Sequence, residues 1–475
     1  MKQVYFFGGG KADGTAQDKN LLGGKGANLA EMTNLGIPVP PGFTISTKVC
    51  TNFMDVGEFP HNLKIEVQNA LEEIEKIMGQ IFGDPENPLL VSVRSGARQS
   101  MPGMMETVLN VGLTSETIPG LIEKSGDERF VYDAYRRLIT MYADVVIEKS
   151  AGIEPKEDEG IREKLDGIMN KMKSQQRVEN DSELSGESLK ELCVLFKAEL
   201  VNTLGEEFPD DPHTQLWGGI TAVFKSWNGK RAVSYRNIEN IPHHWGTAVN
   251  IQAMVFGNMG DNCATGVAFT RNPATGENVF FGEWLPNAQG EDVVAGLRTP
   301  NPLNNLNEGS DAQKLPVLED SMPTIYAELD SIQKRLETHY NDMQDIEFTI
   351  QNGRLWMLQT RTGKRNGQAA VRMAVEMLEE GTIDEKTALM RVKPEQLDEI
   401  MHPMLDEQAE KKSELLAKGL PAGPGGASGQ IVFTADEAEV WHKNGKRVIL
   451  VRNETSPEDV HGMFASEAIL TARGG

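Results

Sequence analysis

The chain has 475 residues, of which 39% are hydrophobic and 25% charged, and its formal net charge at pH 7 is −23. At roughly 100–200 residues per domain, this length excludes a single small module and predicts about three globular domains. The acidic balance argues against nucleic acid or an anionic membrane surface as the main partner. It does not exclude a small anionic ligand, because salt screens charges beyond about 8 Å and the ligand responds to the cations lining its own pocket.

The cysteine content and the start of the chain bear on location. The three cysteines, Cys50, Cys193 and Cys263, are widely separated and odd in number. This pattern fits neither a disulfide framework nor a thiolate metal site, and it favours a reducing compartment. The first residues lack a hydrophobic signal core, and no apolar run approaches about 18 residues. We therefore expect a cytoplasmic protein with no membrane partner.

Residues 20–41 predict a turn, a helix that includes 27–32, and a second turn rich in proline. The first turn contains Lys25 within a run of glycines. Glycines allow the backbone to approach a phosphate closely, and the lysine adds a positive charge. The motif is not a Walker A loop, because Gly26 follows Lys25 where that loop has Ser or Thr. A plain turn with a solvated lysine is the alternative.

Residues 89–94 form a candidate buried strand that delivers Arg94 into a loop of small residues. A guanidinium in a flexible loop at the end of a strand suits bidentate recognition of a phosphate. A surface salt bridge is the alternative interpretation of Arg94. The methionines within 101–105 are better explained by packing than by ligand binding.

The middle of the chain changes from helical to strand patterns. Residues 115–215 are rich in Glu, Lys, Leu and Met and predict a mostly helical insertion. Residues 246–359 contain short strand patterns, the first at 246–252, separated by Gly and Asn-Pro turns, and predict a second lobe. Within this lobe, the loop 257–266 offers backbone N–H groups and the Thr265 hydroxyl as a cover for a triphosphate. An ordinary hairpin is the alternative for this loop.

The segment 345–361 carries the most informative pattern. Strand alternation over 345–350 places Asp345 and Glu347 on one face and apolar side chains on the other. Two close carboxylates are unfavourable unless a cation lies beside them, and oxygen ligands favour Mg²⁺, which also bridges phosphates. A solvated strand face is the alternative.

The loop between these two strands decides which side chains share the carboxylate face. A two-residue turn would place Gln359 and Arg361 on the face opposite the carboxylates. A three-residue loop at 351–353 would pair Asp345 with Gln359 and bring the carboxylates, the amide and the guanidinium to one side. We predict the three-residue loop.

The last hundred residues predict a connector and a further unit. Residues 368–417 are again helical in pattern, with an interruption at 402–403. The run of proline and glycine at 421–426 then opens a β-containing unit that continues to residue 475.

The glycine-flanked lysine, the arginine loop, the glycine loop and the carboxylate hairpin, in this order, resemble the ATP-grasp nucleotide domain of the pyruvate phosphate dikinase family. The resemblance spans almost the whole chain and is least specific over 115–215. Segments that look like those of the family are 21–26, 91–98, 101–105, 287–292 and 455–459.

The resemblance implies an α+β fold. It comprises an ATP-grasp nucleotide-binding domain with a helical insertion, a helical linker and an incomplete swivelling phosphohistidine domain. The implied domains are a first lobe, the helical insertion, a second lobe with the carboxylate hairpin, the linker and the partial phosphohistidine domain, at residues 1–114, 115–215, 216–365, 366–418 and 419–475.

The resemblance also implies an activity. In that family ATP, inorganic phosphate and pyruvate interconvert with AMP, pyrophosphate and phosphoenolpyruvate through a phosphohistidine. Such transfer depends mostly on positioning and charge neutralisation. Three groups of residues have implied roles: phosphate binding for Lys25, Arg94 and Arg361; binding of Mg²⁺ and ATP, as metal ligands, for Asp345, Glu347 and Gln359; and closure over the γ-phosphate for Gly103, Thr265 and Gly266.

The sequence departs from the family at residue 475. The family's nucleophilic histidine follows a Thr-x-Arg-Gly-Gly stretch by a few residues, and here that stretch is 471–475. We therefore expect a monomeric fragment that binds Mg²⁺-ATP without completing catalysis, and that would meet pyruvate or phosphoenolpyruvate only through a domain it lacks. His461, His243 and His244 are interpreted as surface, turn or packing residues.

Two other functions compete with this interpretation. One is a fragment of phosphoenolpyruvate synthase, which shares the architecture and uses water in place of inorganic phosphate. The segment from Arg94 to Met105 looks more like the dikinase. The other is a non-catalytic nucleotide-binding module, for which an intact ATP site without a nucleophile would suffice.

Overall fold

The computed structural model combines helices and strands, and its contacts divide the chain into two compact units. The first unit comprises Met1–Thr270 and Val279–Gly363, and the second comprises Arg271–Asn278 and Lys364–Gly475. The described residues are 2–101, 103–153, 159–294, 299–307, 315–401, 406, 409, 412–414, 416, 419, 425–455 and 459–472.

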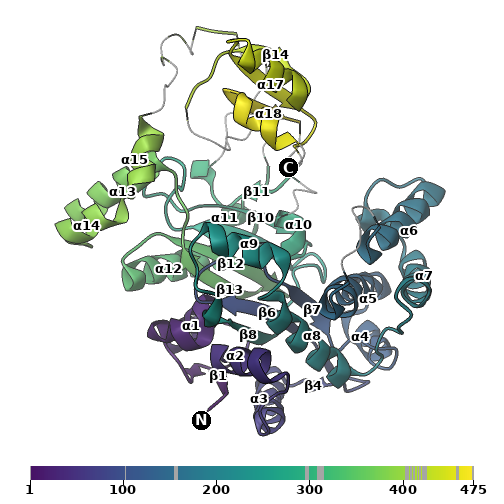
Figure 1. Cartoon of the computed structure of the whole chain (residues 1–475). Helices are drawn as coiled ribbons and strands as arrows, with labels where there is room; N and C mark the ends of the chain where they lie inside the picture. The colour runs from purple at the N-terminus through teal and green to yellow at the C-terminus, as the bar shows by residue number, and fades with distance from the viewer. Residues whose placement is uncertain are drawn as a thin grey trace. The chain divides into compact units, whose positions relative to one another are not determined.

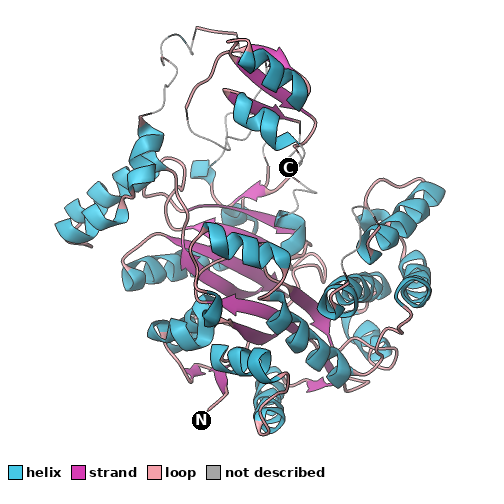
Figure 2. Ribbon diagram, viewed as in Figure 1, coloured by secondary structure: helices cyan, strands magenta, loops and turns pink. Residues whose placement is uncertain are grey.

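The first unit contains a six-stranded antiparallel sheet with the spatial order β2-β1-β3-β8-β6-β7 (Figures 1 and 2). A separate two-stranded sheet lies at β4 and β5. The strands are β1 (Val4–Gly8), β2 (Lys11–Ala12), β3 (Gly42–Ile45), β4 (Ile81–Phe82), β5 (Pro88–Leu89), β6 (Val91–Ala97), β7 (Thr107–Val111) and β8 (Thr247–Ala253).

Strand β8 differs from the expectation, which placed residues 246–252 in the second lobe. It lies between β3 and β6 in the first sheet. All seven of its residues are buried, because the strand has a partner on each edge and covered faces on both sides. Its partner strands β3 and β6 lie far earlier in the sequence. Grouping residues 246–252 with the strand patterns that follow them in the sequence therefore assigned this strand to the wrong sheet.

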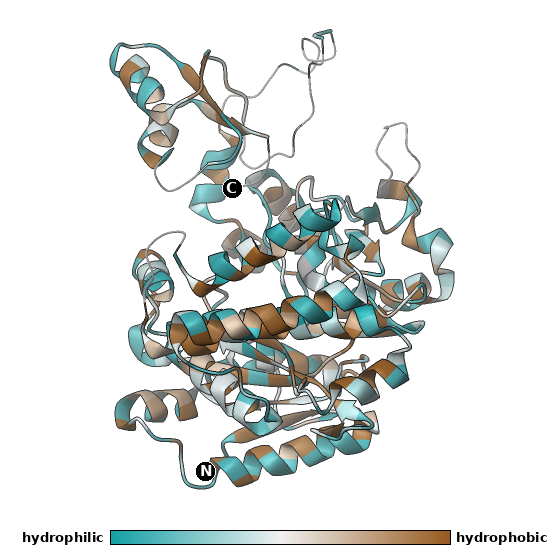
Figure 3. Ribbon diagram, turned by 90° about the vertical axis from the view of Figure 1, so that its right-hand side faces the viewer, coloured by the Kyte–Doolittle hydropathy of each residue, from teal (hydrophilic) through white to brown (hydrophobic). Residues whose placement is uncertain are grey.

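The helices of the first unit pack on this sheet and beside it. In α3 the buried residues recur at spacings of three and four, as in an amphipathic helix, and both hydrophobic and hydrophilic residues alternate along the helices of Figure 3. The larger helices are α1 (Lys19–Asn34), α2 (Thr47–Val56), α3 (Leu63–Met78), α4 (Ile118–Ser125), α5 (Glu128–Tyr142), α6 (Ile161–Gln176), α7 (Gly186–Leu204), α8 (Pro212–Ser226), α9 (Lys230–Ile238) and α12 (Pro323–Tyr340).

The stretch 115–215 is helical, as its composition predicted. Helices α5, α6 and α7 gather beside the β7 edge of the first sheet (Figure 1), and α5 packs against β7. A π-helical turn, Ala143–Glu148, follows α5. The exact domain boundaries stay a prediction.

A second antiparallel sheet of the first unit has the order β11-β10-β9-β12-β13. Apolar side chains of β12 and β13 form a core with helix α12 on one face of this sheet. The opposite face is therefore free for polar residues. Its strands and short helices are β9 (Ala264–Phe269), β10 (Phe281–Pro286), α10 (Gly290–Val294), β11 (Asn301–Pro302), α11 (Leu318–Ser321), β12 (Gln344–Gln351) and β13 (Arg354–Thr362).

In its described residues, the second unit has helices α13, α14 and α15 and a small α/β part that also contains α17 and α18. The small part is a parallel sheet of order β14-β15-β16 with a core that includes Val432, Val448 and Leu450. Residues 402–403, 421–424, 456–458 and 473–475, on which several expectations rest, lie outside the described residues. The elements are α13 (Gly367–Glu379), α14 (Glu385–Arg391), α15 (Pro394–Ile400), β14 (Gln430–Val432), α17 (Ala435–Lys443), β15 (Val448–Arg452), α18 (Val460–Ala465) and β16 (Ala468–Thr471).

Among the residues that the structure describes, no helix has both the length and the apolar composition that crossing a membrane requires.

Candidate functional site

A cavity of about 660 Å³ lies within the first unit. Its walls come from β6, the end of β8 and the segment after it, β9 and β12, and from helices α5, α6, α7 and α10. Four residues that the sequence singled out line it: Arg94, Thr265, Gly266 and Glu347. The cavity therefore joins motifs that are up to 253 positions apart, since it contains both Arg94 and Glu347.

The β12–β13 hairpin has a two-residue turn, so the predicted three-residue loop is wrong. Gln351 pairs with Arg354 across Asn352 and Gly353, which both have positive φ, of 51° and 72°. Such φ values are those of the tight turn that an Asn-Gly pair favours between antiparallel strands. The Asn-Gly pair in the sequence indicates a two-residue turn. We predicted a three-residue loop instead, because only that loop would place Gln359 and Arg361 on the carboxylate face of a regular hairpin.

A bulge in β13 supplies the odd residue that the turn does not. Phe348 pairs with Met357, whereas Glu347 pairs with Gln359, so Leu358 is the extra residue. Gln359 therefore faces Glu347, as expected, but for a different reason. The predicted pairing of Asp345 with Gln359 is wrong, because Asp345 pairs with Arg361.

The hairpin brings two carboxylates and two guanidinium groups together on the face away from α12. The Arg361 Nε donates a hydrogen bond to Asp345 Oδ2 at 2.7 Å. The Arg94 Nη2 lies 3.6 Å from Glu347 Oε2 and joins the first sheet to the second. Burial raises the pKa of Asp345, an effect that Glu347 adds to and Arg361 opposes. The ionised form of Asp345 is therefore disfavoured in this site, and a bound cation would stabilise it.

Lys25 lies where helix α1 restarts after a break. Gly23 interrupts the helix with φ 69° and ψ 173°, and an added Cβ there would overlap the Gly96 carbonyl oxygen at the end of β6. This close approach places Lys25 near the arginines of the site. Burial, followed by the charge of Arg94, lowers the pKa of Lys25 to about 7, and Glu347 partly opposes this.

We expect Gly23→Ala to lower the free energy of unfolding by about 3 kcal/mol or more, because φ and ψ at this position are accessible almost only to glycine and a methyl group would meet the Gly96 carbonyl. Chemical denaturation measures the change. The matched control is Gly57→Ala, at a helix end where φ is 80° and nothing lies within 4 Å of the added carbon. It should cost only about 1 kcal/mol. Equal losses in the two variants would contradict the close approach.

Thr265 and Gly266 belong to strand β9 and not to the glycine loop, which corrects their expected setting. The Thr265 hydroxyl donates to the Phe348 carbonyl at 3.2 Å and is buried. An added Cβ at Gly266 would lie 2.6 Å from the Glu283 carbonyl oxygen. Both residues fit tightly between neighbouring strands, so they form part of the cavity wall. The alternation of small and apolar residues over 264–269 was the signal for a strand.

Gly103 has an open setting, since no described residue beyond its chain neighbours lies within 4 Å of a Cβ added to it. It is exposed, has φ 70°, and is not among the residues that line the cavity. The expectation that the nearby methionines pack is confirmed, because Met101, Met104 and Met105 lie in a small apolar cluster with Trp227. The role of Gly103 stays a prediction.

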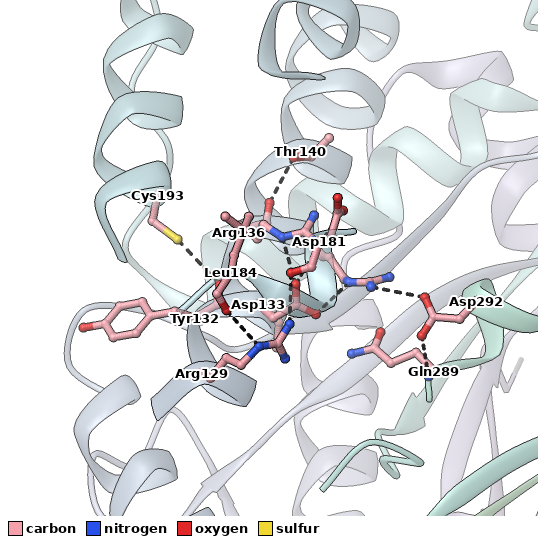
Figure 4. Close-up of polar contacts among 12 residues, drawn as sticks. Arg129, Tyr132, Asp133, Arg136, Thr140, Asp181, Leu184, Cys193, Gln289 and Asp292 are labelled. Atoms are coloured by element: carbon pink, nitrogen blue, oxygen red, sulfur yellow. Dashed lines mark hydrogen bonds and ion pairs between the residues drawn. The ribbon is translucent and has the colours of Figure 1, made fainter. Parts of the chain in front are cut away.

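The sequence missed a charged wall of the cavity on helix α5. Arg137 donates to Asp133 at 3.0 Å and pairs with Asp292 at 3.2 Å, which connects α5 to α10. Figure 4 shows Asp133 and Asp292 on the two sides of this contact. Arg136 also pairs with Asp133. Although burial opposes ionisation, these arginines and Arg129 hold the pKa of Asp133 below its usual range. Two consecutive arginines in a helical stretch were the available signal.

The histidines have structural contacts. His461 pairs with Asp436 at 2.9 Å on the surface of the second unit, as expected for a surface role. His243 contacts Arg236 through Nδ1, at 3.1 Å from Nε. In the described parts of the chain, no three or more His, Cys, Asp or Glu side chains gather as metal ligands do. The expected metal site instead consists of two carboxylates and the Gln359 amide.

These features define a class of protein: one with two sheets that contribute to the wall of one cavity, where Arg94 of the first sheet meets Glu347 of the second. The residues that line this cavity do not include Lys25, Asp345, Gln359 or Arg361. The family model described as pyruvate phosphate dikinase, AMP/ATP-binding domain, matches residues 19–64, 56–304 and 304–382. The chain belongs to this family.

Relatives with assigned names are similar to this chain along its full length. The chain is 51% identical over 475 residues to a pyruvate, phosphate dikinase of Rhizobium meliloti (strain 1021). It is 52% identical over 474 residues to pyruvate, phosphate dikinase 2 of Oryza sativa subsp. japonica, and 48% identical over 476 residues to the enzyme of Clostridium symbiosum. Each comparison covers 100% of this chain and 51% of the relative, so the chain spans about half the length of these relatives.

Proposed function

We propose that the first unit binds Mg²⁺-ATP in an ATP-grasp arrangement and serves the phosphoryl-transfer part of the pyruvate, phosphate dikinase reaction. In that reaction ATP, inorganic phosphate and pyruvate interconvert with AMP, pyrophosphate and phosphoenolpyruvate. The observation that carries the proposal is the meeting of Arg94 and Glu347, 3.6 Å apart, in the wall of one cavity. The family description and the relatives' names support the choice of nucleotide and reaction.

The cationic residues suit the phosphates. Arg94 and Arg361 offer planar forks of N–H donors, which match phosphate oxygens in pairs, and each now contacts a carboxylate that a bound cation would engage instead. Lys25 adds a point charge at the restart of a helix, where backbone N–H groups also favour an anion. Together they would orient the triphosphate and offset its charge.

The acidic residues fit magnesium. Asp345, Glu347 and Gln359 present oxygen atoms on one face of the hairpin, and burial raises the pKa of Asp345 despite its contact with Arg361, so a bound cation would favour the ionised carboxylate there. Magnesium held there would supply charge neutralisation at the phosphates. Thr265 and Gly266 would shape the wall near the phosphates. Closure by Gly103 over the γ-phosphate is the least supported of these roles.

Titration calorimetry of the whole chain with ATP and excess Mg²⁺ tests the proposal. We expect one ATP per chain, and a marked loss of affinity when Mg²⁺ is removed by a chelator. The absence of saturable binding in the presence of Mg²⁺ would overturn the assignment. Binding of equal strength with and without Mg²⁺ would overturn the metal roles of the hairpin residues.

ATP binding should take up a proton near pH 8. The pKa of Lys25 is lowered to about 7 in the free protein, so the amine is mostly neutral at pH 8. Phosphates favour the charged form and raise the pKa, so the affinity for ATP should fall as pH rises above about 7. Calorimetry in two buffers of different ionisation enthalpy gives the number of protons, expected to approach about one. Release of a proton, or no uptake, would contradict the lowered pKa of Lys25 in the free protein.

A further inference from the structure

Asn250, which no motif singled out, contacts the two segments that carry Lys25 and Arg94. It is in the middle of β8, is completely buried, and pairs with Thr44 of β3 on one side and Arg94 of β6 on the other. Residues directly opposite each other in a sheet point to the same face. The Asn250 side chain therefore shares a face with Arg94.

The Asn250 amide fills the space between the two segments. Its Oδ1 accepts a hydrogen bond from the Thr44 hydroxyl at 2.8 Å. A Cβ added to Gly26, next to Lys25, would lie 2.6 Å from the Thr44 hydroxyl and 2.8 Å from this Oδ1, and one added to Gly96 would lie 2.5 Å from Nδ2. Asn250 therefore contacts both segments, at Gly26 together with the Thr44 side chain that it is bonded to.

Stability does not account for an amide at this place. The Nδ2 group is buried and has no hydrogen-bond partner among the described residues. A buried donor without a partner is costly, and an apolar side chain of similar shape would avoid that cost. The amide instead acts as a rigid spacer between α1 at Gly26 and β6 at Gly96. Its position is fixed by the hydrogen bond from Thr44.

We propose that Asn250 is a positioning residue for the triphosphate of ATP, which acts by setting the separation of Lys25 and Arg94. This inference rests on the proposed ATP site. Asn250 itself contacts both segments at their glycines and is not among the residues that line the cavity. Its effect should therefore be confined to the phosphates, and the nucleoside part of the ligand should not depend on it.

The first test compares two ligands in one variant. In Asn250→Ala, binding of Mg²⁺-ATP should weaken at least about tenfold, whereas binding of adenosine, followed by ligand-observed NMR, should stay unchanged. Asn250→Ser provides a second variant, with a smaller expected loss, in case the first folds poorly. The matched control is Gln215→Ala, because Gln215 is another fully buried amide, on α8, with contacts to Gly112 and Leu113 away from the cavity. It should lower stability and leave both ligands unaffected.

The second test uses the close approach to Gly96. Gly96→Ala should weaken Mg²⁺-ATP binding, because the methyl group meets Asn250 Nδ2, while the next nearest atom is 3.6 Å away. Adding Asn250→Ala removes this conflict, so the double variant should bind Mg²⁺-ATP more tightly than Gly96→Ala alone.

The outcomes separate the inference from the proposed function. Equal losses for ATP and adenosine, no loss for ATP, or additive losses in the double variant would overturn the positioning role while leaving the ATP site intact. Failure of the wild-type chain to bind Mg²⁺-ATP would overturn the proposed function and this inference with it.

Discussion

Glu347→Gln should weaken binding of Mg²⁺-ATP by about 100-fold at saturating Mg²⁺, which is the upper range for the loss of a group that supports a metal site. The substitution keeps the shape of the side chain and removes its charge. Arg94 then loses its partner at 3.6 Å, and the hairpin face keeps only one carboxylate beside Gln359. Titration calorimetry measures the loss, which should almost vanish when Mg²⁺ is absent in both proteins.

The control for this prediction is Glu283→Gln. Glu283 is an exposed residue of β10 in the same sheet, aligned through Val267 of β9 with Glu347. It is not among the residues that line the cavity. Affinity should be unchanged in this variant. If Glu347→Gln and Glu283→Gln had equal effects, a general change in charge would explain the result and the metal role of Glu347 would be wrong.

Lys25→Met should weaken binding of Mg²⁺-ATP by about 10- to 100-fold at pH 7, since charge-assisted hydrogen bonds to phosphates are among the stronger polar interactions. The loss should shrink at higher pH, because the wild-type amine, with a pKa of about 7 in the free protein, is then increasingly neutral before ATP binds. Proton uptake on binding should disappear in the variant. Calorimetry at pH 7 and pH 9 provides both readouts.

The same substitution separates binding from stability. Because the pKa of Lys25 is lower in the folded than in the unfolded chain, the unfolded chain binds more protons between pH 7 and the ordinary lysine pKa, and wild-type stability should rise with pH in that window. Lys25→Met should lack this contribution. Lys19→Met, at the exposed start of the same helix, should change neither affinity nor this pH dependence. An unchanged pH dependence in Lys25→Met would show that Lys25 is not the group responsible.

Some of the site could be predicted from sequence because it depends on local geometry. Strand alternation placed Asp345 and Glu347 on one face, and both point away from the apolar core under α12. The glycines around Lys25 predicted a turn before a helix, and Gly23 does interrupt α1 there, with positive φ. These inferences needed only neighbouring residues.

Other features depend on contacts that sequence does not display. The bulge at Leu358 lies within a strand that has ordinary composition, and only the pairing with β12 reveals it. The position of β8 in the first sheet depends on β3 and β6, which lie far earlier in the chain. Arg137 is connected to the rest of the site by its ion pair with Asp292, which lies 155 positions later in the sequence. Neither residue belongs to a motif that could be recognised by its spacing.

The extra residue at Leu358 gives β13 two halves of opposite parity. Leu355 and Met357 pack in the apolar core, and beyond the bulge the polar Gln359 and the charged Arg361 lie opposite Glu347 and Asp345. The two-residue turn at Asn352–Gly353 sets the pairing of the first half, and the bulge alone then shifts the polar side chains onto the carboxylate face. The two halves of this strand thereby present their alternate side chains to opposite faces of the sheet. Residues in one half can be substituted during evolution without changing which face the residues of the other half point to.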